Sequence, residues 1–489
     1  GGGGNQRALA DAVDAVASAA DSWTGPTPPP RWPDPLPARL TLSSLNRGFG
    51  LRDRPAVRRV EPLVWDPIER PGHLAVFGMV GSGAIEGVVA GAVDLSRRRS
   101  ASELHLHVVD SSGGLGQLTR LPHCASAVVG GDLDHLDRLL DWLAREADRT
   151  RGRDLDVAHL LVIDDVGAVL SLLDRADPVG GVDRLQRILH DGPAAGISAA
   201  LVADRVAALP ARLASHVVTR IVLRTSDPHD GSPAGRGSDL GATAPPGRGV
   251  EMESGHHVQL ARVDEASIVA ASKGMPPGRA SGVVALPDDV AIGAVAAEAY
   301  RTDRGWFVPL GVGGRRGSEV VGVELRAEHD LVVVAPDTEV RQRVLATIWA
   351  LVRSVDRGAH QLLLRSCEVA ASSSAAEAAG PACSPGRALV LVETSSGPGD
   401  QRCLDRLLAS ARAAGSAVVV AGDAGAVRSA TGWGVALATT TIILCGPDAR
   451  GDAEVLGLRV GRGWTPQARG RARILTPDGV HLVQLVGAT

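Results

Sequence analysis

Lysine is almost missing from this 489-residue chain: Lys273 is its only lysine, against a large excess of arginine. A site that depends on the compact ammonium group of lysine must use Lys273 or do without one. The five cysteines show neither C-x-x-C spacing nor histidines at metal-ligand spacing, which favours free thiols over a metal site. No apolar run approaches the ~18 residues of a membrane span.

The net charge of the chain and its first residues exclude further classes of protein. The near-neutral net charge of −4 does not suit a chain that wraps nucleic acid or coats an anionic membrane. The opening GGGGNQRALADAV has neither an initiator methionine nor a signal segment, and we interpret it as the interior of a longer polypeptide. We expect the chain to be cytoplasmic, either alone or as the cytoplasmic part of a membrane-anchored protein.

Strand-like apolar runs alternate with amphipathic stretches along most of the chain. Such alternation predicts an α/β fold with a mostly parallel sheet and helices on both of its faces. The runs form two groups of five, so the pattern predicts two such units. They are residues 73–77, 104–109, 159–163, 197–202 and 220–224 in the first group, and 330–335, 360–365, 388–392, 417–421 and 441–445 in the second.

The two groups end alike, with a His-x-x-Gln-Leu motif at 256–260 and again at 481–485. A shared tail of this kind indicates an internal duplication. A proline-rich stretch ahead of the first group reads as a stiff linker, and a small-residue connector separates the groups. The expected divisions are a linker over 25–50, a first domain over 51–272, a connector over 273–304 and a second domain over 305–489.

A glycine frame follows the first strand-like run. Gly78 and Gly83 stand at the two glycine positions of the phosphate-loop pattern G-x-x-x-x-G-K-[ST], ahead of a segment with helical spacing. Glycines there let backbone N–H groups point into a concavity at a helix N-terminus, where an anion is stabilised. The candidate nucleotide-binding residues are Gly78, Met79, Val80, Gly81, Ser82, Gly83, Ala84 and Ile85.

Two functional side chains of that pattern are missing. Ala84 stands where the pattern has lysine, and Ile85 where it has the hydroxyl that holds Mg²⁺. A charge-assisted contact contributes ~1.5–3 kcal/mol to binding, and a positioned donor ~2.7–4 kcal/mol to the rate, so efficient hydrolysis is not expected. Two interpretations stay open: weak binding of ATP with Mg²⁺, or a turn that only packs a strand against a helix.

Acidic residues end a later run of the first group. Asp164 and Asp165 follow residues 159–163, the place where such ATPases carry the Walker B acids that organise Mg²⁺ and water. They are the candidate catalytic residues, and Asp164 is the candidate Mg²⁺ ligand. An apolar strand that ends in aspartate is also common in α/β proteins without any metal.

The second group has lost more of the site. Ala335 and Val340 replace the two glycines, Arg341 stands at the lysine position, and the acid-bearing run ends at Glu393. A planar guanidinium does not replace a compact ammonium. We therefore expect neither ATP nor Mg²⁺ at the second site.

Together these stretches resemble P-loop motor domains of the FtsK/SpoIIIE family. FGMVGSGAIE, LLVIDD and PPGRGVEMESGHHVQLA agree with that family in order and spacing over residues 51–263. The resemblance is strongest to the tandem C-terminal ATPase domains of EccC-type type VII secretion proteins, or of actinobacterial proteins that join such domains to FHA domains. It implies two tandem RecA-like P-loop NTPase domains, with residues 1–24 as the tail of a preceding domain.

The chain departs from the family pattern at a third place. Active members often carry Thr-Gln-Arg or Thr-Asn-Arg after the fourth strand, where this chain has Ala203, Asp204 and Arg205. An acidic Asp204 facing a γ-phosphate would repel it. Arg205 and Arg248 are the candidates for a sensor or an arginine finger, and a turn residue is the simpler interpretation of Arg248.

The resemblance implies ring or stacked homo-oligomers in which one domain drives transport and others regulate it or bind clients. We expect a degenerate ATPase that regulates, or docks clients to, an active motor domain upstream in the same polypeptide, with secreted proteins as clients. Two alternatives stay open: an active ATP-driven DNA or protein translocase, and a nucleotide-independent interaction scaffold.

DNA as a partner fits the family but not the charge pattern. No basic stripe with interleaved aromatic residues occurs in the sequence. The arginine run at 96–100 ends the helix predicted after the glycine frame, where cations suit the helix dipole, and we interpret it as a solvated helix end.

Overall fold

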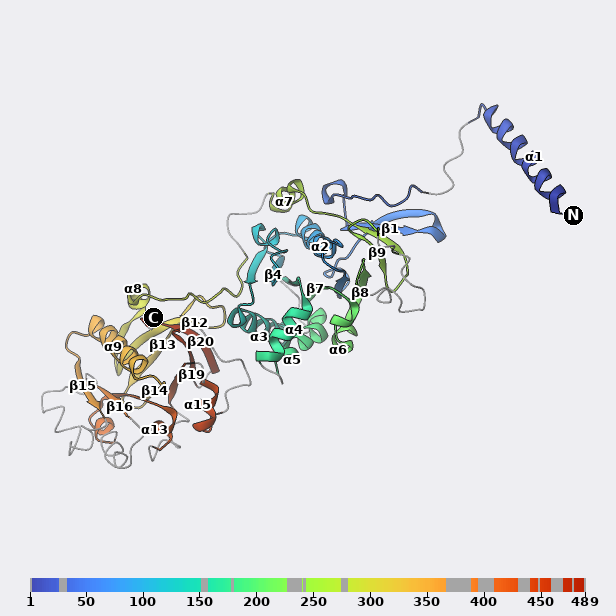
Figure 1. Cartoon of the computed structure of the whole chain (residues 1–489). Helices are drawn as coiled ribbons and strands as arrows, with labels where there is room; N and C mark the ends of the chain where they lie inside the picture. The colour runs from blue at the N-terminus through green and yellow to red at the C-terminus, as the bar shows by residue number, and fades with distance from the viewer. Residues whose placement is uncertain are drawn as a thin grey trace.

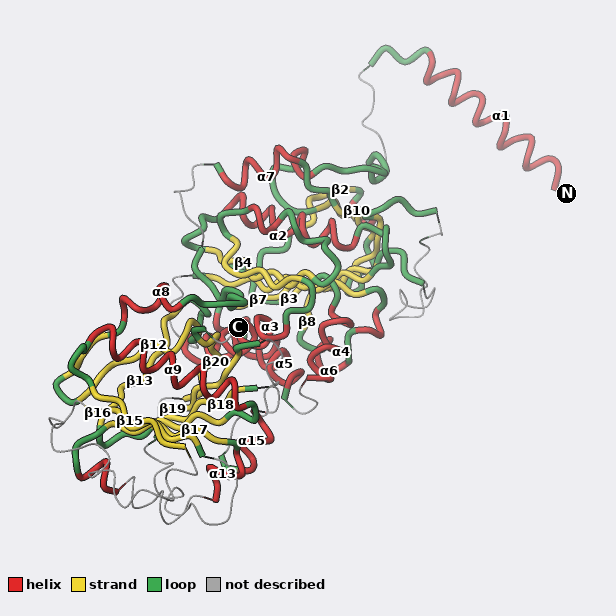
Figure 2. The backbone as a smooth tube through the Cα atoms, turned by 60° about the vertical axis from the view of Figure 1, so that its left-hand side comes forward, coloured by secondary structure: helices red, strands yellow, loops and turns green. Residues whose placement is uncertain are grey.

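The computed structural model contains two α/β units and an N-terminal helix that stands away from them (Figure 1, Figure 2). That helix is α1 (Gly2–Asp21). None of the described helices is long and apolar enough to cross a membrane. The described residues are 2–25, 33–150, 157–176, 180–226, 240, 243–273, 280–365, 388–394, 409–429, 440–446, 449–458, 469–476 and 479–487.

Some predictions concern residues outside this described part. The proline-rich linker is described only from residue 33 onward, and the connector between the domains only at Lys273 and from residue 280. Cys367, Cys383 and Cys403 also lie outside it. Cys124 and Cys445 are described; both are buried, and neither forms a disulfide within the described part of the chain.

The first unit is built on one sheet whose middle is parallel. Six strands run parallel in the order β8-β3-β7-β6-β4-β5, and four antiparallel strands extend the sheet past β8 in the order β9-β10-β1-β2. The predicted, mostly parallel sheet is confirmed. Its strands are β1 (Gly50–Arg54), β2 (Arg59–Leu63), β3 (His73–Phe77), β4 (Leu104–Asp110), β5 (Cys124–Val129), β6 (Ala158–Ile163), β7 (Ile197–Ala203), β8 (Val217–Val222), β9 (Arg248–Glu251) and β10 (His257–Leu260).

Helices cover both faces of this sheet, as predicted (Figure 2). Leu74 and Val76 of β3 point into the core shared with α2 and α7, and Ala75 and Phe77 into the core shared with α3 to α6. Strands buried on both faces must be apolar throughout, which is why they are visible as continuous runs in the sequence. The helices are α2 (Ala84–Arg98), α3 (Leu133–Thr150), α4 (Val166–Ala176), α5 (Gly181–Asp191), α6 (Ala211–Ala214) and α7 (Glu265–Ser272).

The second unit repeats this plan in shorter form. Five described strands run parallel in the order β18-β14-β17-β16-β15, and β19, β20, β12 and β11 extend them antiparallel, with β13 paired to β12. All ten predicted runs overlap strands of the two sheets. The strands are β11 (Tyr300–Thr302), β12 (Gly305–Gly313), β13 (Glu319–Arg326), β14 (Leu331–Val334), β15 (His360–Arg365), β16 (Ala388–Glu393), β17 (Ala417–Gly422), β18 (Thr441–Cys445), β19 (Arg471–Thr476) and β20 (Gly479–Leu485). The helices are α8 (Ile292–Val295), α9 (Thr338–Val355), α13 (Ala424–Ser429) and α15 (Ala449–Val455).

The tails of the two units share their register. Gln259 of β10 faces Arg248 of β9, and Gln484 of β20 faces Arg471 of β19. In each unit this antiparallel pair lies beside the parallel part of the sheet. The matching registers support the internal duplication indicated by the His-x-x-Gln-Leu motif.

The connector between the units packs along the first unit, next to β5. Val283 is fully buried; its N–H donates to Oγ of Ser126 (2.9 Å), and its carbonyl accepts a hydrogen bond from Nε2 of His135 (2.9 Å). Because β5 is an end strand of the sheet, the connector protects an edge that would otherwise be open to pairing with another chain.

Arg471 of the second unit reaches the first unit. Its Nε donates to the carboxylate of Asp134 at the start of α3 (3.3 Å), and its Nη1 and Nη2 donate to the carbonyls of Pro287 (2.6 Å) and Leu286 (3.1 Å). Arg471 and Asp134 are both buried. One desolvated charge pair therefore ties the two units and the connector together.

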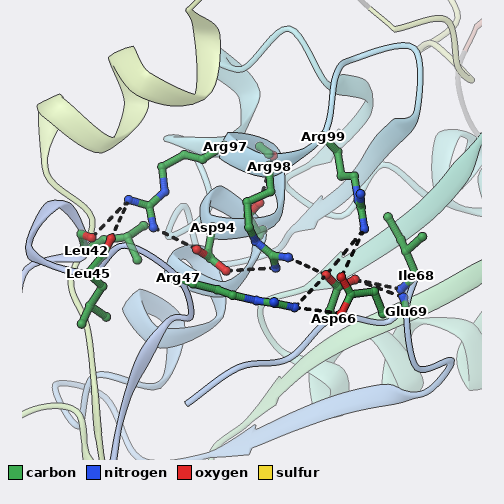
Figure 3. A network of polar contacts seen from close by, with 12 residues as sticks. Leu42, Leu45, Arg47, Asp66, Ile68, Glu69, Asp94, Arg97, Arg98 and Arg99 are labelled. Carbon is green, nitrogen blue, oxygen red and sulfur yellow. Dashed lines mark hydrogen bonds and ion pairs between the residues drawn. The ribbon is translucent and has the colours of Figure 1, made fainter. Parts of the chain in front are cut away.

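A polar network fixes the C-terminal end of α2 (Figure 3). Arg97 donates to Asp94 (2.9 Å), and Arg98 bonds to Asp66 (2.5 Å) and lies 3.1 Å from Asp94. Burial opposes ionisation of Asp66, but the hydrogen bond from Arg98 holds the pKa of Asp66 below its usual range. The run at 96–100 does end the helix, but Arg98 and Arg99 are not a solvated helix end, because acids of the segment before β3 pair with them.

His73 begins β3 and is fully buried. Its Nδ1 accepts the N–H of Ala199 (2.8 Å), so Nε2 carries the proton and donates to the carbonyl of Leu189 (2.8 Å). The bond from Ala199 needs the neutral ring, because a protonated Nδ1 cannot accept a hydrogen bond. Burial is the main cause that lowers the pKa of His73 to about 4, from an ordinary value of 6.5.

The free energy of unfolding is therefore expected to fall as the pH drops from about 6.5 toward 4. The unfolded chain binds the proton first, so the contribution of neutral His73 is complete above the unfolded pKa and is lost below it. Urea unfolding at several pH values in this window measures the slope. His73→Gln removes this titrating ring and should reduce the slope, while His159, whose pKa is also lowered to about 4, still contributes to it. An unchanged slope in that variant would exclude His73 as a source.

Candidate functional site

The glycine frame forms the predicted strand-turn-helix, between β3 and α2. Gly81 and Gly83 have φ angles of 77° and 94°, in the left-handed region that favours glycine. The N–H of Gly78 donates to the carbonyl of Ala203 at the end of β7 (2.9 Å). The turn is therefore anchored to the middle of the parallel sheet.

Packing alone accounts for two of its glycines. A Cβ atom at Gly78 would lie 2.3 Å from the hydroxyl of Ser82, and one at Gly83 would lie 2.4 Å from the backbone nitrogen of Gly247. The Gly247 N–H also donates to the carbonyl of Ser82 (2.7 Å). Ser82 is buried, and its hydroxyl has no hydrogen-bond partner among the described residues. The turn is thus packed tightly, with Gly78 against the side chain of Ser82 and Gly83 against Gly247 of the loop before β9.

Some backbone donors remain at the start of α2. Within the described part of the chain, no group accepts a hydrogen bond from the N–H of Gly81, Gly83 or Ala84. Such groups are the ones that bind an anion at a helix N-terminus. The N–H of Ser82 is not available in the same way, because it donates to the carbonyl of Met79 (2.9 Å).

Ile85 stands where the Mg²⁺-binding hydroxyl is expected and packs against the loop after β4. A Cβ atom at Gly114 of that loop would lie 2.9 Å from Cγ2 of Ile85. Ala84, at the lysine position, is buried. These two side chains offer neither a charge to a phosphate nor an oxygen to a metal.

Asp164 follows β6 and holds the loop that follows the neighbouring β4. Its carboxylate accepts the N–H of Ser111 (2.8 Å) and both the N–H (2.6 Å) and the hydroxyl (2.5 Å) of Ser112. Asp164 is buried. Both of its carboxylate oxygens therefore have partners within the protein.

Asp165 caps the next helix. Its Oδ1 accepts the N–H of Ala168 in the first turn of α4 (2.9 Å), the task of an N-cap aspartate. Among the described residues, no group of three or more histidine, cysteine or carboxylate side chains is placed to hold a metal ion. Each of the two predicted acids thus has a structural task at the end of its strand.

Asp110 is a buried acid that the sequence patterns do not single out. It ends β4, and its carboxylate accepts the N–H groups of Gly113 (2.8 Å) and Leu115 (3.3 Å). Burial, and then the hydrogen bond with Asp164, raise the pKa of Asp110. A strand run ending in Asp-Ser-Ser-Gly-Gly was a visible signal, but only the order of the strands brings Asp110 beside Asp164.

The two candidate arginines lie in different settings. Arg205 is exposed and lies 3.5 Å from Asp204. Arg248 donates from Nε to the side chain of Gln259 (3.0 Å) and from Nη2 to the carbonyl of Leu36 (2.8 Å). Arg248 is thus engaged with the segment ahead of the first unit, and a finger role toward a neighbouring subunit stays a prediction for both arginines.

Arg341 fills the corresponding turn of the second unit. Its Nη1 donates to the carbonyls of Ala335 (2.6 Å) and Pro336 (3.1 Å), and its Nη2 to Oγ1 of Thr338 (2.6 Å). Its Nε lies 3.6 Å from the carboxylate of Glu393 at the end of β16. The side chain at the lysine position has turned back into its own loop and paired with the acid at the Walker B position.

This architecture is that of two tandem P-loop NTPase domains, and comparison with solved structures agrees. EccC (ATPases 2 and 3) of Thermomonospora curvata, in complex with a signal sequence peptide, matches with a TM-score of 0.58 at 18% identity, covering 94% of this chain and 99% of that one. EssC (ATPases 2 and 3) of Geobacillus thermodenitrificans matches with a TM-score of 0.62 at 14% identity, covering 93% and 99%. The predicted fold class is confirmed.

Sequence comparison leads to the same secretion systems. The ESX-4 secretion system protein EccC4 of Mycobacterium tuberculosis is 26% identical over 335 residues, which are 65% of this chain and 27% of that protein. The ESX secretion system protein YukB of Bacillus subtilis is 24% identical over 222 residues, 42% of this chain and 15% of that protein. No protein-family model matches the chain. The predicted resemblance to EccC-type ATPase domains is confirmed, and the chain spans only a small part of these relatives.

Proposed function

We propose that this chain is a degenerate, non-hydrolysing part of a larger type VII secretion-like motor. In this role its two units regulate an active motor domain upstream in the same polypeptide, or dock clients to it, on the cytoplasmic side of a membrane-anchored assembly. The similarity to EccC and EssC ATPase domains supports the secretion setting.

One observation supports the loss of hydrolysis: the residues at the expected Mg²⁺ position of the first site are already engaged in contacts within the protein. Mg²⁺ demands oxygen ligands in a near-octahedral arrangement. Ile85 is apolar and packs against Gly114, while Asp164 is bonded to Ser111 and Ser112. These residues do not fit a Mg²⁺-bound nucleotide.

The two units are expected to differ in nucleotide binding without hydrolysis. In the first, the N–H groups of Gly81, Gly83 and Ala84 support weak binding of a phosphate group. In the second, the buried Arg341 and its partner Glu393 take up the turn, so we expect no ATP there.

Phosphate release is the direct test of this proposal. With saturating ATP and Mg²⁺, the purified chain is expected to show no turnover above buffer, because a missing donor alone costs ~2.7–4 kcal/mol of barrier lowering. Asp164→Asn is the matched variant and should change nothing. Turnover in the wild type that Asp164→Asn abolishes would show an active motor instead.

The clients and the assembly are part of the same proposal. The Thermomonospora curvata structure holds a signal sequence peptide, and we extend this to signal segments of secreted proteins as clients of the present chain. Ring or stacked homo-oligomers are expected by the same resemblance. A DNA substrate has no support from the charge pattern.

A further inference from the structure

A cavity of about 280 Å³ lies at the edge of the first sheet where β4, β6 and β7 begin. We call it the edge cavity. Leu104 and Ala158, which line it, are the first residues of β4 and β6, and Ser198 is the second residue of β7. The glycine frame instead follows the carboxyl end of β3, which runs parallel to these strands. The two sites are therefore at opposite edges of the sheet.

Most of the wall of the edge cavity is apolar. The segment between β2 and β3 contributes two prolines and an isoleucine, and the starts of the strands contribute two leucines. These residues are Pro67, Ile68, Pro71, Leu104 and Leu160. The volume is close to the lower end of the range for small-molecule sites, which combine such a wall with a few polar groups. The wall suits an apolar ring or chain.

A buried hydroxyl also lines the edge cavity. Ser198 is only 4% exposed, and its hydroxyl has no hydrogen-bond partner within the described part of the chain. Buried polar side chains nearly always have such a partner, and leaving one without a partner is costly. A ligand in the cavity that bonds to this hydroxyl would remove that cost.

The positive charge at the edge cavity is Arg99, the residue after α2 (Figure 3). The acids near it are bonded more closely to other arginines: Asp66 accepts a hydrogen bond from Arg98, and Glu69 accepts one from Arg47 (2.8 Å). Arg99 lies 3.8 Å from each of these acids. Its Nε is buried without a hydrogen-bond partner among the described residues. Its charge is therefore the least compensated in the network of Figure 3.

Two other titratable residues line the edge cavity. Glu103 is exposed, and its carboxylate accepts the N–H and the hydroxyl of Ser100 (both 2.8 Å). His159 shares a hydrogen bond between its Nδ1 and Nε2 of His107 (3.1 Å). Burial lowers the pKa of His159 to about 4, so its ring is neutral at pH 7. Arg99 is thus the cationic group that a ligand meets there.

We propose that the edge cavity binds a small carboxylic acid with an apolar body. The carboxylate pairs with Arg99, whose guanidinium matches its planar geometry. The apolar body lies against the proline and leucine wall, and Ser198 supplies a hydrogen bond. The site does not rest on the proposed function, because it needs neither a nucleotide nor a secreted client.

Titration of the purified chain with phenylacetate and with hexanoate, followed by ligand-observed NMR, tests the site. At least one of these acids is expected to bind with a Kd of about 1 mM or tighter, as a ligand of this size can. The matching amides, phenylacetamide and hexanamide, keep the shape and lose the charge. They should bind about tenfold or more weakly.

Arg99→Met removes the charge and keeps the length of the side chain. It should weaken binding of the acid about tenfold or more and leave binding of the amide nearly unchanged. Arg70→Met, at an exposed arginine of the segment between β2 and β3, is the matched control and should change neither. Thermal melts establish that each variant is folded.

Ala158→Leu is the second variant and tests the cavity without touching its charge. The larger side chain takes up space in the cavity, so binding of acid and amide should both be lost. Binding of neither acid at concentrations up to about 10 mM overturns the proposal. Binding of an acid that Arg99→Met or Ala158→Leu leaves unchanged overturns it as well, and places the acid elsewhere on the chain.

Discussion

Replacing Arg471 by methionine is expected to uncouple the two units. The change removes the arginine that pairs with the buried Asp134 and the donors to the carbonyls of Leu286 and Pro287. Removing one side of a buried ion pair typically costs ~3–5 kcal/mol. A lysine-specific endoproteinase can cut the chain between its units at Lys273, which is exposed and is the only lysine. After this cut, the halves of the wild type should elute together in size exclusion, and the halves of the variant should separate.

The matched control is Arg469→Met, two residues earlier in the chain, where the side chain is exposed. Its halves are expected to stay together after the same cleavage. Halves of Arg471→Met that also stay together would mean that the contact between the units does not depend on this charge pair.

Replacing Arg341 by alanine is expected to lower the free energy of unfolding of the second unit by about 3 kcal/mol. Glu393 would lose its ion pair, and the carbonyls of Ala335 and Pro336 would lose their donor. Protection of the amides of α9 against hydrogen exchange, followed with increasing urea, measures the loss. The same variant should still fail to bind ATP, because alanine supplies no cation.

Arg343→Ala provides the comparison on the same helix. Arg343 pairs with Glu339 one turn away at the surface, and such pairs contribute at most about 0.5 kcal/mol. If the two alanine variants are equally stable, Arg341 does not hold the turn of the second unit in the way its contacts indicate.

The central strands of both sheets could be predicted because burial on both faces makes them continuous apolar runs, as in β3 and β14. The strands that the patterns missed are shorter, more polar or interrupted. β1 reads GLRDR, and β12 contains Pro309 with a register shift beside it. β5 is an end strand, packed by the connector rather than by a further strand, so tertiary context decides its conformation.

The candidate site was predictable in its residues but not in its contacts. Residues 78–85 form the expected turn. The sequence pattern does not show, however, that the side chain of Ser82 points inward and packs against Gly78. Asp164 meets Ser111 and Ser112 only because β4 and β6 are neighbours in the sheet. The contact of Arg248 with Leu36 depends on its pairing with Gln259, which only the register of β9 with β10 reveals.

Calorimetric titration with ATP and Mg²⁺ tests the central claim most directly, on the wild-type chain and on the double variant Ala84→Lys with Ile85→Ser. A degenerate first site predicts little or no heat for the wild type and clear binding for the double variant, whose cradle regains its charge and its hydroxyl. Tight, Mg²⁺-dependent binding by the wild type would contradict the claim. It would mean that another cation has replaced the lysine, and it would reopen the alternative of an active ATP-driven translocase.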